Sequence, residues 1–160
     1  MPVNSTIGKE AEKKIREWLD RPQDGYSFDR FYDQMTGYYE TSRNICDFHV
    51  FKAPNSYYIE SKSTWEDRFD FSLIQDHQKD GLIEKGKIDH CYGWFILLFA
   101  SHQRAFKVDA SDIQYLIDHG KKSLNIKKLD SWGIPYKELR TIPNTRKKLL
   151  DYIGEIEELI

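Results

Sequence analysis

The chain has 160 residues, 39% hydrophobic and 14% aromatic, so it can fill one packed core, and we expect a single domain over residues 1–160. Its net charge of −2 gives no sign of nucleic-acid binding, and its longest apolar run, Trp94–Ala100, is too short to cross a membrane. The N-terminus lacks the apolar segment of a signal peptide, and the two cysteines form no CxxC pair. We therefore expect a cytoplasmic protein without a structural zinc site.

Four apolar residues near the N-terminus recur at the spacing of one helix face: Ile7, Ala11, Ile15 and Trp18. They predict a helix from about Ser5 to Leu19, which Pro22 ends. A short strand is expected near Phe28–Tyr32, with a loop after Gly37.

The middle of the chain alternates strand and helix patterns. "ICDFHVF" and "YYIESKS" alternate as strands do, and the turn "APNS" joins them into a hairpin. A helix is expected over "FSLIQDHQKDGLIEKG", then a buried central strand over "WFILLFA" with "RAFKVDA" as its hairpin partner. A third helix is expected over "ASDIQYLIDHG", which Gly120 ends.

Apolar residues at helical spacing in the tail predict a final helix within Asn144–Ile160: Leu149, Ile153, Ile156 and Ile160. Strands and helices interleave along the chain. The expected class is therefore α/β (α+β mixed), with a mixed β-sheet flanked by helices.

The hairpin carries an unusual set of charges in Asp47, Glu60 and Lys62. With the turn near Pro54–Asn55, one register sets Asp47 opposite Lys62 and Glu60 opposite His49. A shift by two residues sets Asp47 opposite Glu60. Because side chains alternate across a strand, either register places two carboxylates beside one ammonium on the same face.

Two adjacent carboxylates repel each other, and a hard divalent cation relieves the repulsion. Mg²⁺ is bound by one or two carboxylates together with water and phosphate oxygens, and it polarises a phosphate and acidifies a bound water. Lys62 could act as a base when neutral, or orient that water when charged. The pattern thus suits phosphodiester hydrolysis, and the alternative is a surface hairpin with a charged outer face.

A basic segment follows in the last third of the chain. Between Lys121 and Lys148 there are nine basic residues and only two acids, so the segment is either a phosphate-facing patch or the solvated side of ordinary elements. The candidate DNA contacts are Lys121, Lys122, Lys127, Lys128, Arg146, Lys147 and Lys148.

Five further stretches, together with the Asp…Glu-x-Lys set, follow one another in an order that is typical of one nuclease family: "GKEAE", "FSLIQDHQKDGL", "WFILLF", "GKKSL" and "IPNTRKKLLDYI". In this order the chain resembles the PD-(D/E)XK nucleases, and specifically the RecU family of Holliday-junction resolvases, over about Ile7 to Ile153. The resemblance implies a restriction-endonuclease-like fold, a homodimer, Mg²⁺ or Mn²⁺ as cofactor, and paired nicks in a four-way DNA junction.

The resemblance also implies roles for individual residues. Asp47 and Glu60 would be metal ligands, Lys62 the catalytic lysine and Gln78 an active-site helix residue. Glu12 would be the acid of the first helix, with Glu10 nearby as the alternative.

The chain departs from the family in one place. Only residues 21–43 fill the space in which the family carries a stalk that enters the junction, and "GYYETSR" is either a remnant of this stalk or plain core and loop. Three hypotheses therefore stand: a resolvase of branched DNA, a related nuclease of duplexes, flaps or other DNA, and a non-catalytic DNA-binding domain of the same fold. The complete Asp47, Glu60 and Lys62 set argues against the third.

Overall fold

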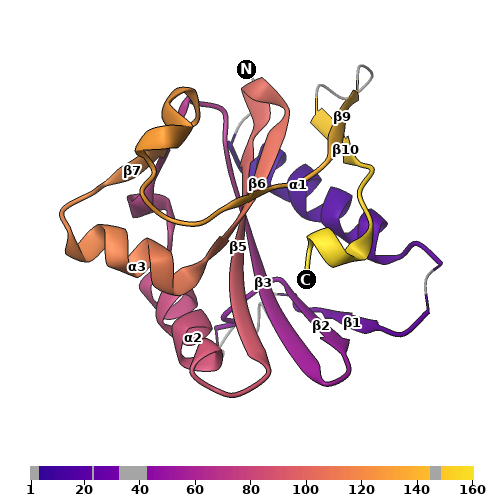
Figure 1. Ribbon diagram of the computed structural model, residues 1–160. Coiled ribbons are helices and arrows are strands. Elements are labelled where there is room, and N and C mark those ends of the chain that lie inside the picture. The colour runs from indigo at the N-terminus through magenta and orange to yellow at the C-terminus, as the bar shows by residue number, and fades with distance from the viewer. Residues whose placement is uncertain (1–3, 23, 33–42, 145–148) are drawn as a thin grey trace, which may run out of the picture.

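A six-stranded mixed sheet forms the centre of the molecule, with α1 on one face and α2 and α3 on the other (Figure 1). The computed structural model describes residues 4–22, 24–32, 43–144 and 149–160. The sheet consists, in spatial order, of β1 (Ser27–Arg30), β2 (Phe48–Lys52), β3 (Asn55–Thr64), β5 (Cys91–Phe99), β6 (Arg104–Asp109) and β8 (Lys137–Glu138). The helices are α1 (Asn4–Leu19), α2 (Asp76–Gly86) and α3 (Ala110–Asp118).

Two small sheets and four short 3₁₀ turns complete the described part of the chain. β4 (Arg68–Asp70) pairs with β7 (Ser123–Asn125), and β9 (Thr141–Asn144) pairs with β10 (Leu149–Tyr152). The 3₁₀ turns are η1 (Phe71–Leu73), η2 (Ala100–His102), η3 (Ile126–Ser131) and η4 (Ile156–Glu158). Among the described helices, none is long and apolar enough to cross a membrane.

The sheet is antiparallel except between β3 and β5, which run parallel and are connected through α2. A parallel pair needs such a crossover, because the chain must return to the start of the first strand. The expected hairpin of β2 and β3, the central strand β5 and its partner β6 are all present. The expected mixed sheet flanked by helices is thus confirmed.

One core lies between α1 and the sheet. The predicted helix stripe is buried there, with Ile7, Ala11, Ile15 and Trp18 each at most 3% exposed. Alternate residues of the hairpin meet it, and Phe48, Val50 and Ile59 are fully buried. The charged hairpin is therefore anchored through its apolar face, as its alternation predicts.

A second core lies on the other face, beneath α2 and α3. Phe95, Leu97 and Phe99 of β5 point into it, and the rings of Phe99 and Phe106 meet edge to face at 5.9 Å. Leu82 of α2 is fully buried against them. The near-continuous apolar run of β5 is explained because this strand is covered on both faces.

The expected final helix is wrong. Residues 149–152 form strand β10 instead, paired with β9, and only the 3₁₀ turn η4 follows. Tertiary packing overrides the helical spacing: Tyr152 stacks on Trp18 at 4.7 Å, and the Trp18 indole donates to the carbonyl oxygen of Gly154 at 2.8 Å. Ile153, assigned to the inner face, is 47% exposed.

The second helix also begins later than expected. The Asp70 carboxylate accepts from Ser72 N at 2.9 Å and caps η1, and Gln75 is extended before α2 begins at Asp76. Asp and Ser stabilise such turns by bonding to nearby main-chain groups. The first turn of the predicted helix is therefore a separate 3₁₀ turn.

Gly93 should be essential to the seating of α2 on β5. A Cβ at Gly93 would collide with the carbonyl oxygen of Leu82. This oxygen belongs to the main chain and cannot move away by a side-chain rotation. We expect Gly93→Ala to lower the free energy of unfolding by about 1–3 kcal/mol, as overpacking does, in urea denaturation monitored by circular dichroism. Gly86→Ala is the matched control because its Cβ meets nothing within 4 Å, and it should be neutral or stabilising. Equal effects of the two variants would contradict this account.

Candidate active site

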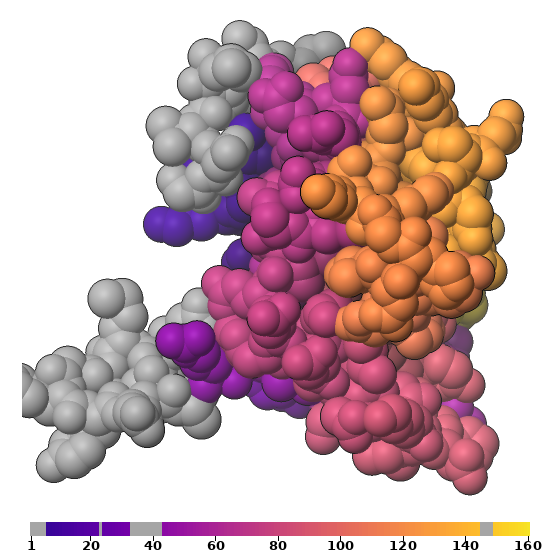
Figure 2. Space-filling model, turned by 90° about the vertical axis from the view of Figure 1, so that its left-hand side faces the viewer, coloured from indigo at the N-terminus to yellow at the C-terminus, as the bar shows by residue number. Residues whose placement is uncertain are grey.

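The site exists because β3 is longer than its partner β2. The ladder between them ends where Phe48 faces Ile59, whereas β3 stays paired with β5 as far as Thr64. Beyond Ile59 the edge of β3 therefore opens into a cleft of about 430 Å³ between α1 and the start of α2. Figure 2 shows the hollow between the indigo residues of α1 and the magenta residues from β3 onward.

The register brings the two predicted metal ligands together. When the β2–β3 pairing is continued by one residue beyond Phe48 and Ile59, Asp47 lies opposite Glu60. The register with Asp47 opposite Lys62 is therefore wrong. Asp47 is held at both ends, since its N–H donates to Ile59 O at 3.0 Å and its Oδ2 accepts from Ser61 N at 2.9 Å. His49 stacks on Tyr58 at 4.7 Å instead of facing Glu60.

Glu60, Lys62 and Gln78 form a closed triangle. Lys62 Nζ lies 2.8 Å from Glu60 Oε1 and donates to Gln78 Oε1 at 2.7 Å. Gln78 Nε2 in turn donates to Glu60 Oε1 at 2.6 Å. The other carboxylate oxygen, Glu60 Oε2, is buried and has no hydrogen-bond partner. A buried acceptor without a donor is costly, so this oxygen is placed for a ligand such as a cation.

Arg30 is a site residue that the sequence reasoning missed. Its guanidinium bonds to Glu12 Oε2, lies 3.2 Å from Asp47 Oδ1 and donates to Asp47 O at 3.0 Å. It reaches them because Arg30 faces Phe48 across the β1–β2 ladder, next to Asp47. The only signal in the sequence was an arginine on a short strand before the acid. Glu12 thus lines the cleft, whereas the alternative, Glu10, does not.

The electrostatics of the pair favour a bound cation. Burial raises the pKa of Glu60, and the neighbouring Asp47 carboxylate raises it further, against the attraction of Lys62. Burial also raises the pKa of Asp47, although the Ser61 N–H and Arg30 oppose the shift. The thiol of Cys46, also in the cleft wall, is made inert because burial raises its pKa to about 12.

The donor set suits a hard divalent ion. Within the described ranges no cluster of three or more His, Cys, Asp or Glu side chains gathers as a complete metal cage. Mg²⁺ and Mn²⁺ need no such cage, because two carboxylates suffice when water and a substrate phosphate supply the remaining ligands. Asp47 and the free Oε2 of Glu60 therefore fit such an ion.

The predicted DNA contacts fall into three groups. Lys121 donates to the carbonyl oxygens of Ser131 and Trp132 and so supports a loop. Lys122, Lys127 and Lys128 are exposed, and Lys127 lies 2.5 Å from Asp67. Arg146, Lys147 and Lys148 lie outside the described residues, as does most of "GYYETSR".

A mixed sheet that carries an acidic pair and a Glu-x-Lys strand in an open cleft is the arrangement of a nuclease. The chain belongs to the RecU family: the family model described as "Recombination protein U" matches residues 26–158, and this is a family of Holliday-junction resolvases. The family expected from the sequence motifs is thereby confirmed.

The structure is similar to that of Hjc, a Holliday junction resolvase from the archaeal hyperthermophile Archaeoglobus fulgidus, with a TM-score of 0.47 and 14% identity, over 66% of this chain and 78% of that chain. The comparison with curated proteins found no match.

The metal-free protein should lose stability with rising pH through Glu60. Its folded pKa lies above the unfolded value of about 4.3, so between the two the folded state binds the extra proton and stability falls as pH rises. We expect Glu60→Gln, which removes this charge, to raise the free energy of unfolding at about pH 9 by on the order of 1–3 kcal/mol and to change it little at about pH 5.

The measurement is urea unfolding at both pH values with EDTA present. Asp29→Asn serves as the control, because the Asp29 side chain is 77% exposed and lies outside the cleft, so this variant should not reproduce the effect of Glu60→Gln. A Glu60→Gln variant that is less stable than the parent at the higher pH would contradict the assignment of a strained, buried Glu60.

Proposed function

We propose that this chain is a Mg²⁺- or Mn²⁺-dependent endonuclease that resolves Holliday junctions by phosphodiester hydrolysis, with Asp47 and Glu60 as the metal ligands. One observation carries the proposal: the unpartnered, buried Oε2 of Glu60 beside Asp47, in a cleft open to solvent. The bound ion would polarise the scissile phosphate and lower the pKa of the attacking water.

The remaining side chains act by position. Lys62, held by Glu60 and Gln78, points its ammonium into the cleft, where it orients the water or stabilises charge that develops on the phosphate. Gln78 fixes both members of that pair at once. Arg30 keeps Asp47 and Glu12 in place from the opposite wall.

Resolution needs two nicks at symmetric positions, and each chain has one such cleft in its described part. We therefore infer a homodimer on the DNA, with one cleft for each of two strands. Branched DNA is the expected substrate because it offers two equivalent strands in this arrangement.

A second candidate keeps the chemistry and changes the substrate to duplex, flap or other DNA. The observation that favours it is the short segment of residues 21–43, in the place where the family carries its junction-entering stalk. A non-catalytic DNA-binding domain is the third reading, and it leaves the close contacts among Glu60, Lys62 and Gln78 without a purpose.

Cleavage of a synthetic four-way junction tests the proposal. With Mg²⁺ we expect paired nicks, and with Asp47→Ala or Glu60→Ala a loss on the order of a thousandfold, because each variant removes a ligand. Gln78→Ala, which only loosens Lys62 and Glu60, should cost about 10–100-fold. Asp29→Ala is the control for the loss of an acid outside the cleft and should cut like the parent.

Parent-like rates for both ligand variants would refute the site. Linear duplex, flap and junction should be compared in the same salt, because phosphate-driven binding depends steeply on salt. Equal rates on all three substrates would favour the second candidate.

The exposed lysines of η3 and its surroundings are proposed to contact DNA phosphates. Lys127 and Lys128 line a hollow of about 440 Å³ together with His102, Arg104 and Asp130. Each phosphate contact contributes about 0.9 to the slope of log affinity against log salt. We expect Lys128→Gln and Lys122→Gln each to lower the slope by about this amount, in fluorescence anisotropy titrations of the junction with EDTA.

Lys121→Gln is the matched control, because the Lys121 ammonium is engaged by two carbonyl oxygens. It should leave the slope unchanged. An unchanged slope in Lys122→Gln and Lys128→Gln as well would show that DNA binds elsewhere.

A further inference from the structure

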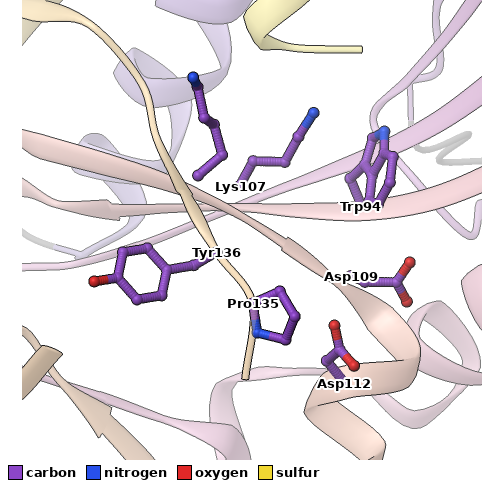
Figure 3. A pocket seen from close by; sticks show the side chains of 7 residues that line it. Trp94, Lys107, Asp109, Asp112, Pro135 and Tyr136 are labelled. Carbon is purple, nitrogen blue, oxygen red and sulfur yellow. The ribbon is translucent and has the colours of Figure 1, made fainter. Parts of the chain in front are cut away.

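A second cavity, of about 330 Å³, lies away from the catalytic cleft and shares no lining residue with it. It is lined by residues of β5, β6, β8 and the start of α3, together with Pro135 and Tyr136 (Figure 3). Cavities of this size hold small molecules rather than single ions. Its lining has an unusual chemistry, which nothing in the proposed nuclease mechanism uses.

Two lysines stand side by side at this cavity, and the carboxylate of Glu158 acts on Lys137 only from beyond ion-pair distance. Lys107 of β6 faces Lys137 of β8 directly in their antiparallel ladder, which brings two positive charges close together. In the part of the chain that the structure describes, neither ammonium is within ion-pair distance of an acid. Burial and the neighbouring Lys137 lower the pKa of Lys107. An anion between them would relieve this repulsion.

Trp94 adds a third donor to the same cavity. Its indole Nε1 is buried and has no hydrogen-bond partner, and Lys107 Nζ lies 4.8 Å from the centre of its ring. A buried donor with nothing to bond is rare in a native structure and calls for an explanation. In the view of Figure 3 the nitrogen atoms of Lys107 and Trp94 lie on one side of the crossing strands.

The remaining walls are flat rings and carboxylates. Pro135 forms one wall, whereas the ring of Tyr136, which also lines the cavity, packs against Phe106 and Trp132. The indole of Trp94 is held rigid because it stacks on Tyr92 at 5.5 Å. Asp109 and Asp112 lie on the side away from the nitrogen atoms in Figure 3. Asp109 is engaged in capping α3 through Ser111 N at 2.7 Å, which leaves Asp112 to meet a ligand.

We propose that this cavity binds one nucleotide, with its phosphate between Lys107 and Lys137 at the Trp94 N–H and its base against Pro135. Lysines take phosphate as point charges, and the indole N–H adds a directed hydrogen bond. A base with an exocyclic amino group can donate to Asp112, as cytosine donates to carboxylates in protein–DNA complexes. The volume matches one nucleotide better than a bare phosphate.

The nucleotide can come free in solution or as an unpaired residue of a DNA strand, because both offer the same phosphate and base. The inference deepens the proposed function where the source is DNA, yet it needs neither the metal nor cleavage. It can therefore hold when the nuclease assignment fails, and fail when that assignment holds.

The test is a titration of the full chain, labelled with ¹⁵N, in EDTA. The indole N–H resonance of Trp94, assigned with Trp94→Phe, is followed as dCMP, dTMP, inorganic phosphate or a short non-complementary oligonucleotide is added. We expect saturable shifts with dCMP, weaker binding of dTMP and of phosphate, and about tenfold weaker dCMP binding in Lys107→Gln and in Lys137→Gln.

Lys85→Gln is the matched control, since Lys85 also lies 5.0 Å from an aromatic ring centre, that of Tyr58, but has no part in this cavity. It should bind dCMP like the parent. Lys137 is exposed, so its variant should fold even if that of the half-buried Lys107 does not.

The sources are separated by comparing the free nucleotide with the oligonucleotide. Tighter binding of the oligonucleotide at the Trp94 signal identifies a strand, and equal or weaker binding identifies a free nucleotide; both outcomes support the site. No shift with any nucleotide, equal affinity for phosphate and dCMP, or affinity unaffected by both lysine variants would overturn the proposal. Asp47→Ala should keep dCMP binding while losing cleavage, which separates this test from that of the nuclease.

Discussion

The contact of two carboxylates at one strand edge is the constraint on which the rest of the site depends. Asp47 and Glu60 are brought together by a register that the apolar face of the hairpin sets, and both are largely removed from water. Such a pair is unfavourable in isolation. Four polar neighbours counter it, although the Glu12 carboxylate adds to the repulsion on Glu60. Arg30 and the Ser61 N–H hold Asp47, while Lys62 and Gln78 hold Glu60. Stability alone gives no reason for this arrangement, whereas the proposed ion-assisted phosphodiester chemistry would give one.

The fold serves this contact by joining three elements that are distant in the sequence. β1 supplies Arg30, α1 supplies Glu12, and α2 supplies Gln78 from the opposite face of the sheet. The close approach of α2 to Gly93 matters for the same reason, because a shift of this helix would move Gln78 relative to Glu60. The packing of α2 on the sheet therefore determines part of the geometry of the site.

Much of this could be predicted from the sequence, because alternation in the hairpin and helical spacing in α1 are local signals of burial. The residue that lies opposite Asp47 could not be predicted, because the turn allows two registers and both leave the charged side chains on the same face of the hairpin. Arg30 was missed because its role arises only when β1 lies beside β2. The helix predicted for the tail was wrong although Leu149, Ile153, Ile156 and Ile160 recur at helical spacing. The contacts of this segment with Trp18, which is far away in the sequence, determine its structure instead.

The fixed charges around the cleft have a further consequence for the order of binding. Three carboxylates, those of Glu12, Asp47 and Glu60, share the cleft with three basic side chains, Lys9, Arg30 and Lys62. A divalent ion that displaces a proton from Glu60 adds one positive charge to the cleft, and the phosphodiester of a bound strand would offset it. Ion and DNA should then each raise the affinity for the other, as reciprocal coupling requires. On the proposed function, the cleft would hold its ion weakly until a strand to be cut is present.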